Sequence, residues 1–134
     1  MLKYLAAYGA TAAVFLALDV VWLTTIALGL YRRELGGLLL DKPSLAISAG
    51  FYLIYVVGIV FFCVVPALNG GNWVNALVSG AVLGLVAYGT YDITNLATLK
   101  NWSTTVAIAD LSWGTALTAI SATAGYLIVA ALPL

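Results

Sequence analysis

The sequence predicts an all-α integral membrane protein whose four transmembrane helices run antiparallel in an up-down bundle. Of its 134 residues, 64% are hydrophobic and 7% are charged, and the mean hydropathy is +1.11. Soluble domains carry about 25% charged residues, and a soluble bundle would need the polar outer faces that these segments lack. Four apolar stretches reach the length of about 20 residues that a membrane crossing requires. They leave no room for a soluble domain, so a single transmembrane domain, residues 1–134, is expected.

The helices follow one another with short connections. They are expected at residues 5–30, 44–68, 74–99 and 105–132. The first apolar run is longer than the core of a signal peptide and ends in Tyr31-Arg32-Arg33, which indicates an uncleaved membrane helix. Because the second and third connections span only a few residues, consecutive helices should be antiparallel neighbours.

Basic residues mark one end of the predicted bundle. The loops 31–43 and 100–104 share a side, and they carry Arg32, Arg33, Lys42 and Lys100. The other side carries Lys3. The positive-inside rule therefore predicts that both loops are cytoplasmic and that both termini lie outside.

The residue inventory limits the chemistry. The single cysteine, Cys63, cannot form an internal disulfide. The absence of histidine excludes haem with axial histidine and HExxH zinc sites. No lysine lies at mid-membrane depth, which argues against a retinal-type Schiff base. No cofactor is expected.

Three aspartates, Asp19, Asp92 and Asp110, lie inside the apolar stretches without a basic companion. A carboxylate at mid-membrane depth costs about 2.5–3.5 kcal/mol on insertion scales, so such residues usually face a protein interior and mark a functional site. Each needs a bound proton, a bound cation or hydrogen-bond donors. The three aspartates are therefore the candidate catalytic residues.

Aromatic and polar residues accompany these aspartates. The first and fourth helices share the pattern Asp-x-x-Trp-x-Thr, as Asp19-Val-Val-Trp22-Leu-Thr24 and Asp110-Leu-Ser-Trp113-Gly-Thr115. Residues three apart share a helix face, and the pattern reflects either an inverted repeat of the transporter kind or chance. The candidate binding residues are Trp22, Tyr52, Tyr55, Tyr88, Tyr91, Asn95 and Trp113.

The candidate residues are expected to lie at similar depths in the membrane. At 1.5 Å per residue, Asp92 and Asp110 lie roughly 11–12 Å from the cytoplasmic helix ends, and Asp19 lies roughly 16–18 Å from them. Aromatic belts at the membrane interface account for Trp102 and other tryptophans and tyrosines at helix ends, but not for Trp22, Tyr55 or Trp113, which are deeper.

Small residues predict a close helix contact. Gly80 and Gly84 share one face of the third helix, and Gly114 and Gly125 belong to a stripe of small residues on the fourth, so the two helices should pack closely. Asp92 and Asn95 carry oxygens that suit a hard cation, but their segment has only one acidic residue. No metal site is therefore expected.

The run from Tyr88 to Trp102, Tyr-Gly-Thr-Tyr-Asp-Ile-Thr-Asn-Leu-Ala-Thr-Leu-Lys-Asn-Trp, closely resembles the signature of an uncharacterised family of bacterial integral membrane proteins of about this length, catalogued as a domain of unknown function. The segments around Asp19 and Asp110 resemble the other two recurrent segments of that family. Ser103 stands where members commonly carry a proline. The resemblance covers the whole chain and implies a four-helix protein of the bacterial inner membrane.

Three functions fit these residues. The first is a site that binds, and modifies by acid–base chemistry of aspartic acid and tyrosine, a lipid-like molecule. The second is a small proton- or cation-coupled transporter acting as a dimer, with tryptophans and tyrosines holding an organic cation. The third is a non-enzymatic accessory subunit in which the polar groups join helices. Besides the lipid bilayer, the expected partners are such a ligand and a second copy or another membrane protein, and no nucleic acid.

Overall fold

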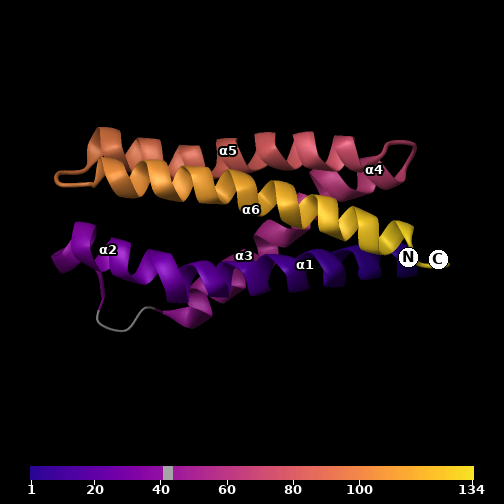
Figure 1. Ribbon diagram of the computed structural model, residues 1–134, viewed down its shortest axis with the longest axis horizontal. Helices are drawn as coiled ribbons and strands as arrows, with labels where there is room; N and C mark the ends of the chain where they lie inside the picture. Colours follow the sequence, from indigo (N-terminus) through magenta and orange to yellow (C-terminus); the bar gives the residue numbers. More distant parts are fainter. Residues whose placement is uncertain (41–43) are drawn as a thin grey trace.

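The computed structural model describes residues 1–40 and 44–134 of the chain. It confirms an all-α membrane bundle, with four helical segments long and apolar enough to cross a membrane. These segments are Leu2–Leu38, Leu45–Leu68, Trp73–Thr98 and Thr104–Ala130. They alternate in direction, and both termini lie at the same end of the bundle (Figure 1).

The first segment is longer than the sequence predicts. It comprises α1 (Leu2–Trp22), a π-helical segment η1 (Leu23–Ala27), α2 (Leu28–Leu35) and a 3₁₀ turn η2 (Gly36–Leu38). The prediction that the helix ends at residue 30 and that a loop begins at residue 31 is wrong. Arginine, glutamate and leucine are good helix formers, so the charged residues continue the helix until Gly36, whose φ is +36°. Lys42, from the predicted loop, lies outside the described residues.

The other segments begin at side-chain caps. The second comprises α3 (Leu45–Ile59), a π-helical segment η3 (Val60–Val64) and α4 (Val65–Leu68). Asn72 and Asn75 form a capping box at the start of α5 (Trp73–Thr98). Ser103 accepts a hydrogen bond from the Val106 amide and caps α6 (Thr104–Ala130). Such caps stabilise helix starts by about 0.5–2 kcal/mol, and each start falls within one residue of its prediction.

The closest packing joins α5 and α6, which make the most extensive contact in the bundle, followed by α1 with α6. A Cβ atom added at Gly80 would lie 2.8 Å from the Ala119 Cα atom, and one added at Gly84 would lie 2.5 Å from the Gly114 carbonyl oxygen. Only glycine permits this approach. The predicted close contact between the third and fourth helices is therefore confirmed.

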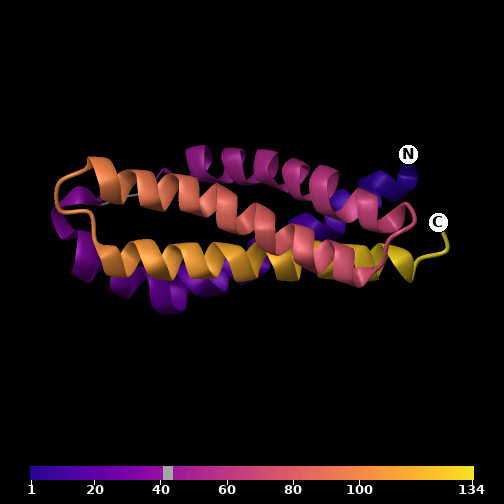
Figure 2. The ribbon, with the colours of Figure 1, turned by 90° about the horizontal axis from the view of Figure 1, so that it is seen from above.

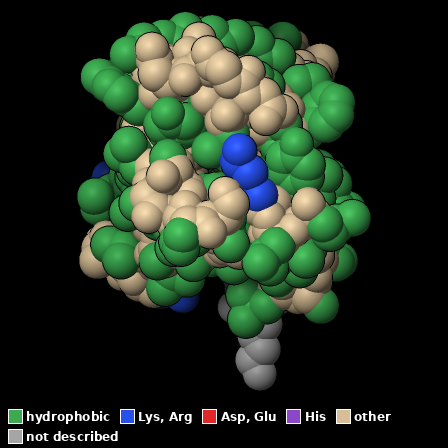
Figure 3. Space-filling view, turned by 90° about the vertical axis from the view of Figure 1, so that its right-hand side faces the viewer, with side chains coloured by type: hydrophobic (Ala, Val, Ile, Leu, Met, Phe, Trp, Pro, Cys, Tyr) green, Lys and Arg blue, Asp and Glu red, His purple; other side chains and the backbone are tan. Residues whose placement is uncertain are grey.

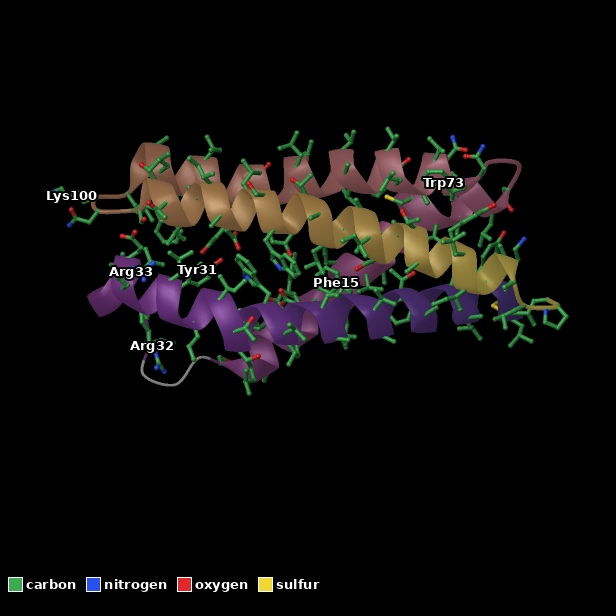
Figure 4. The ribbon with its side chains drawn as sticks, in the orientation of Figure 1. Phe15, Tyr31, Arg32, Arg33, Trp73 and Lys100 are labelled. Atoms are coloured by element: carbon green, nitrogen blue, oxygen red, sulfur yellow. The ribbon has the colours of Figure 1, made fainter. Side chains whose placement is uncertain are left out.

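The two ends of the bundle differ. Arg32, Arg33 and Lys100 lie at the end opposite the termini (Figure 4). The end with the termini shows mainly apolar side chains and backbone, with one prominent basic side chain and no acidic side chain of a described residue in view (Figure 3). At the basic end, α2 and the turn between α5 and α6 extend farther along the bundle than the first residues of α3 (Figure 2).

Candidate functional site

A cavity of about 580 Å³ lies between α1, α2, α3, α5 and α6, in the half of the bundle toward the basic end (Figure 4). Apolar side chains form most of its wall. Eight of the ten predicted site residues line it: Asp19, Trp22, Tyr52, Tyr55, Tyr88, Tyr91, Asp92 and Asp110. All three aspartates, which come from three helices, thus face one space.

Asp19 is held by the fourth helix. Its Oδ1 accepts a hydrogen bond from the indole Nε1 of Trp113 at 3.1 Å. The Trp113 ring in turn stacks on Trp22, with ring centroids 4.8 Å apart and planes 8° from parallel. The repeated Asp-x-x-Trp pattern therefore joins two antiparallel helices, although Trp113 itself does not line the cavity.

Asp110 has a different partner, which sequence reasoning missed. Its Oδ1 accepts a hydrogen bond from the Tyr31 hydroxyl at 2.7 Å. Symmetry of the repeated pattern would have paired Asp110 with Trp22, but the Trp22 Nε1 has no hydrogen-bond partner among the described residues. Tyr31 follows the π-helical segment and belongs to the unpredicted extension of the first helix. The signal available in the sequence was the run of helix-forming residues after it.

The threonines of the repeated pattern bond within their own helices. Thr24 donates to the Val20 carbonyl at 2.8 Å, and Thr115 donates to the Leu111 carbonyl at 2.8 Å. This is the usual role of threonine inside a helix. The polar side chains that line the cavity are instead the aspartates, tyrosines, two tryptophans and Ser48.

Asp92 differs from the other two aspartates. Its side chain is fully buried, and neither carboxylate oxygen has a hydrogen-bond partner among residues 1–40 and 44–134. The carboxyl group of Asp110 on α6 lies beside it, close enough for the two groups to share a proton. Asn95, predicted to share this site, does not line the cavity. An unpartnered buried carboxyl group is costly, so Asp92 is the group in the cavity with the greatest need of a ligand or proton.

Aromatic rings close the cavity on the side toward the termini. Phe15 is fully buried, and its ring contacts those of Tyr52 and Tyr55 edge-on, with both centroid distances 5.6 Å. The Tyr55 ring packs edge-on against Tyr88 at 5.9 Å, and its hydroxyl shares a hydrogen bond of 2.8 Å with Thr118. Sequence reasoning missed Phe15 and Thr118 as parts of this site. The spacing of four between Phe15 and Asp19 was the available signal.

Two further features border the cavity. Trp102, assigned from sequence to an interfacial belt, lines it, and its ring meets Tyr91 edge-on at 5.8 Å. The Tyr88 ring rests on Gly114, where an added Cβ atom would lie 2.1 Å from the ring. The small residue on α6 thereby makes room for an aromatic side chain of the cavity wall.

The cavity is suited to an organic molecule. Hard cations such as Ca²⁺ take six to eight oxygen ligands, and no group of three or more His, Cys, Asp or Glu side chains in the described chain is placed to hold a metal ion. The wall combines apolar surface with a few carboxyl and phenol groups, which is the usual composition of a small-molecule pocket.

Comparison with known proteins identifies the family. No curated protein and no solved structure matches the chain. The profile of the family described as "Predicted membrane protein (DUF2177)" matches residues 4–127, which is most of the 134-residue chain. The chain therefore belongs to this family of membrane proteins, whose description assigns no activity.

Proposed function

We propose that this protein binds a lipid-like small molecule in the cavity and exchanges protons with it. The observation that carries the proposal is the unpartnered, fully buried carboxyl group of Asp92 in a cavity of about 580 Å³ that Asp19 and Asp110 also line. Carboxyl and phenol groups inside an apolar site are suited to general acid–base catalysis.

The wall of the cavity favours an amphiphilic ligand. Ile47 and Phe51 of α3 and Leu38 of η2 line the cavity and are also exposed on the outside of the bundle, with 76%, 63% and 58% of their surfaces accessible. Within a bilayer such side chains face lipid. An apolar tail could therefore leave the cavity along them into the membrane while the polar group stays near Asp92.

A purely structural role fits two of the aspartates better than the third. Asp19 and Asp110 each accept a hydrogen bond from another helix, from Trp113 and Tyr31, as interhelical polar contacts in membranes do. Asp92 accepts no hydrogen bond from a hydroxyl or N–H donor of a described residue, and its neighbour on α6 is another carboxyl group, that of Asp110. A binding site therefore accounts for Asp92 more directly than the accessory-subunit function does.

Transport receives less support than one-sided binding. A transporter needs access from both sides of the membrane, and the cluster of Phe15, Tyr52 and Tyr55 fills the bundle on the side toward the termini. Arg32, Arg33 and Lys100 lie at the other end. Following the positive-inside rule, we propose that the cavity lies in the cytoplasmic half of a bacterial inner membrane.

Co-purification tests the proposal. Wild-type protein, Asp92→Asn and Glu34→Gln are extracted with a copolymer that retains surrounding lipid, and bound molecules are identified by mass spectrometry. Glu34 lies on α2 and does not line the cavity, so its variant is the matched control. A molecule enriched with wild type and Glu34→Gln, and lost from Asp92→Asn at unchanged thermal stability, is expected. Identical profiles for all three proteins would contradict the proposal.

A further inference from the structure

Five polar atoms of residues that line the cavity have no hydrogen-bond partner among the described residues: three carboxyl oxygens and the indole Nε1 atoms of Trp22 and Trp102. Neither oxygen of Asp92 has a hydrogen-bond partner among the described residues, nor does Oδ2 of Asp19, whose side chain is 5% exposed. The described residues that line the cavity include three aspartates and neither lysine nor arginine. The site therefore presents three unpartnered carboxyl oxygens as acceptors, with two indole N–H donors beside them, to whatever it holds.

Building on the binding site proposed above, we propose that the polar group held in this cavity is a primary ammonium. Such a group has three N–H donors and one positive charge. It supplies the donors that Asp92 and Asp19 lack, and its charge offsets the cost of burying carboxylates. A carboxylate or phosphate would instead meet like charges.

Aromatic rings around the acceptors strengthen the same preference. Trp22, Tyr88 and Tyr91 line the cavity beside the aspartates, and aromatic faces attract cations within about 6 Å. A quaternary ammonium would gain this attraction as well, but it has no N–H group and would leave both oxygens of Asp92 unsatisfied. The unpartnered oxygens therefore favour a primary over a quaternary ammonium, because a buried acceptor without a donor is costly.

A ligand series tests the charge and the donors separately. Protein in phosphatidylcholine nanodiscs is titrated with dodecylamine, dodecyltrimethylammonium, dodecanol and dodecanoate, and tryptophan fluorescence is followed because Trp22 and Trp102 line the cavity. Dodecylamine should bind saturably and most tightly. Asp92→Asn should weaken it by at least about tenfold, since loss of one partner of a buried charge pair costs about 2–5 kcal/mol, and Glu34→Gln should leave it unchanged. If Asp92→Asn fails to fold, Asp19→Asn replaces it with the same expectation.

Two sources of the ammonium are distinguished by adding phosphatidylethanolamine to the nanodiscs. Weaker apparent affinity for dodecylamine would identify the lipid headgroup as the occupant, and unchanged affinity would identify a free amine; both support the inference. Equal or tighter binding of dodecanol or dodecanoate would overturn the inference that the ligand carries a primary ammonium, but it would not contradict the proposed binding site. Absence of saturable dodecylamine binding would also overturn it. The proposed function is overturned separately, by identical co-purification profiles for wild type, Asp92→Asn and Glu34→Gln.

Discussion

Replacing Gly84 with alanine tests the closest approach between α5 and α6. The added Cβ atom would lie 2.5 Å from the Gly114 carbonyl oxygen and 2.9 Å from the Thr115 Cα atom, where ordinary contact begins at 3.4 Å. The difference between 3.4 and 2.5 Å requires the two backbones to separate by 0.9 Å. Because both contacts are with backbone, no side-chain rotation can relieve them, and overpacking of this kind costs about 1–3 kcal/mol.

Gly58→Ala is the matched control for this experiment. Gly58 lies in α3, and a Cβ atom added there meets nothing within 4 Å. Both substitutions gain the helix propensity of alanine, about 0.5–1 kcal/mol, so the difference between the two variants isolates the packing cost. SDS-induced unfolding in mixed micelles, followed by circular dichroism, should show Gly84→Ala less stable than Gly58→Ala by about 1–3 kcal/mol. Equal stability of the two variants would refute the close approach of these helices.

Two further substitutions test the interhelical hydrogen bonds of the cavity. Tyr31→Phe removes the hydroxyl donor to Asp110 and should lower the free energy of unfolding by about 1.5–3 kcal/mol. This loss should largely disappear in an Asp110→Asn background. An undiminished loss in that background would show that the hydrogen bond contributes nothing to stability. Trp113→Phe keeps a ring that can stack on Trp22 but removes the donor to Asp19. A loss of similar size is expected, and strictly additive effects with Asp19→Asn in a double-mutant cycle would contradict the contact.

The helices and most of the site residues could be predicted because the signals are local. The apolar lengths and the caps at Ser103 and Asn72 determine where helices lie, without any knowledge of their neighbours. The convergence of Asp19, Asp92 and Asp110 could be anticipated from helix rise and phase alone. These quantities depend on position along a helix, and a regular helix preserves them.

The contacts that could not be predicted depend on departures from regular helix or on tertiary placement. The charged residues after Tyr31 predict a loop there, whereas their helix propensity continues the first helix to Leu35. The position of Trp102 at a helix end predicts a place at the membrane interface and does not reveal that its side chain lines the cavity. Asn95 shares a helix face with Asp92, and this angular position alone predicts it as a binding residue. The angle does not show where the cavity ends along α5.

The π-helical segment Leu23–Ala27 has a consequence for the register of the first helix. A π-turn accommodates one residue more than the α-helical turn it replaces, and each residue of an α-helix advances by about 100°. The chain beyond Ala27 is therefore turned by about this angle from where an uninterrupted α-helix would have carried it, and Tyr31 faces Asp110 as a result. Any relative one residue shorter between Trp22 and Leu28 would present a different side chain to Asp110. Alignments across this segment thus decide which residue of a family member occupies the position of Tyr31, even where every neighbouring motif is unchanged.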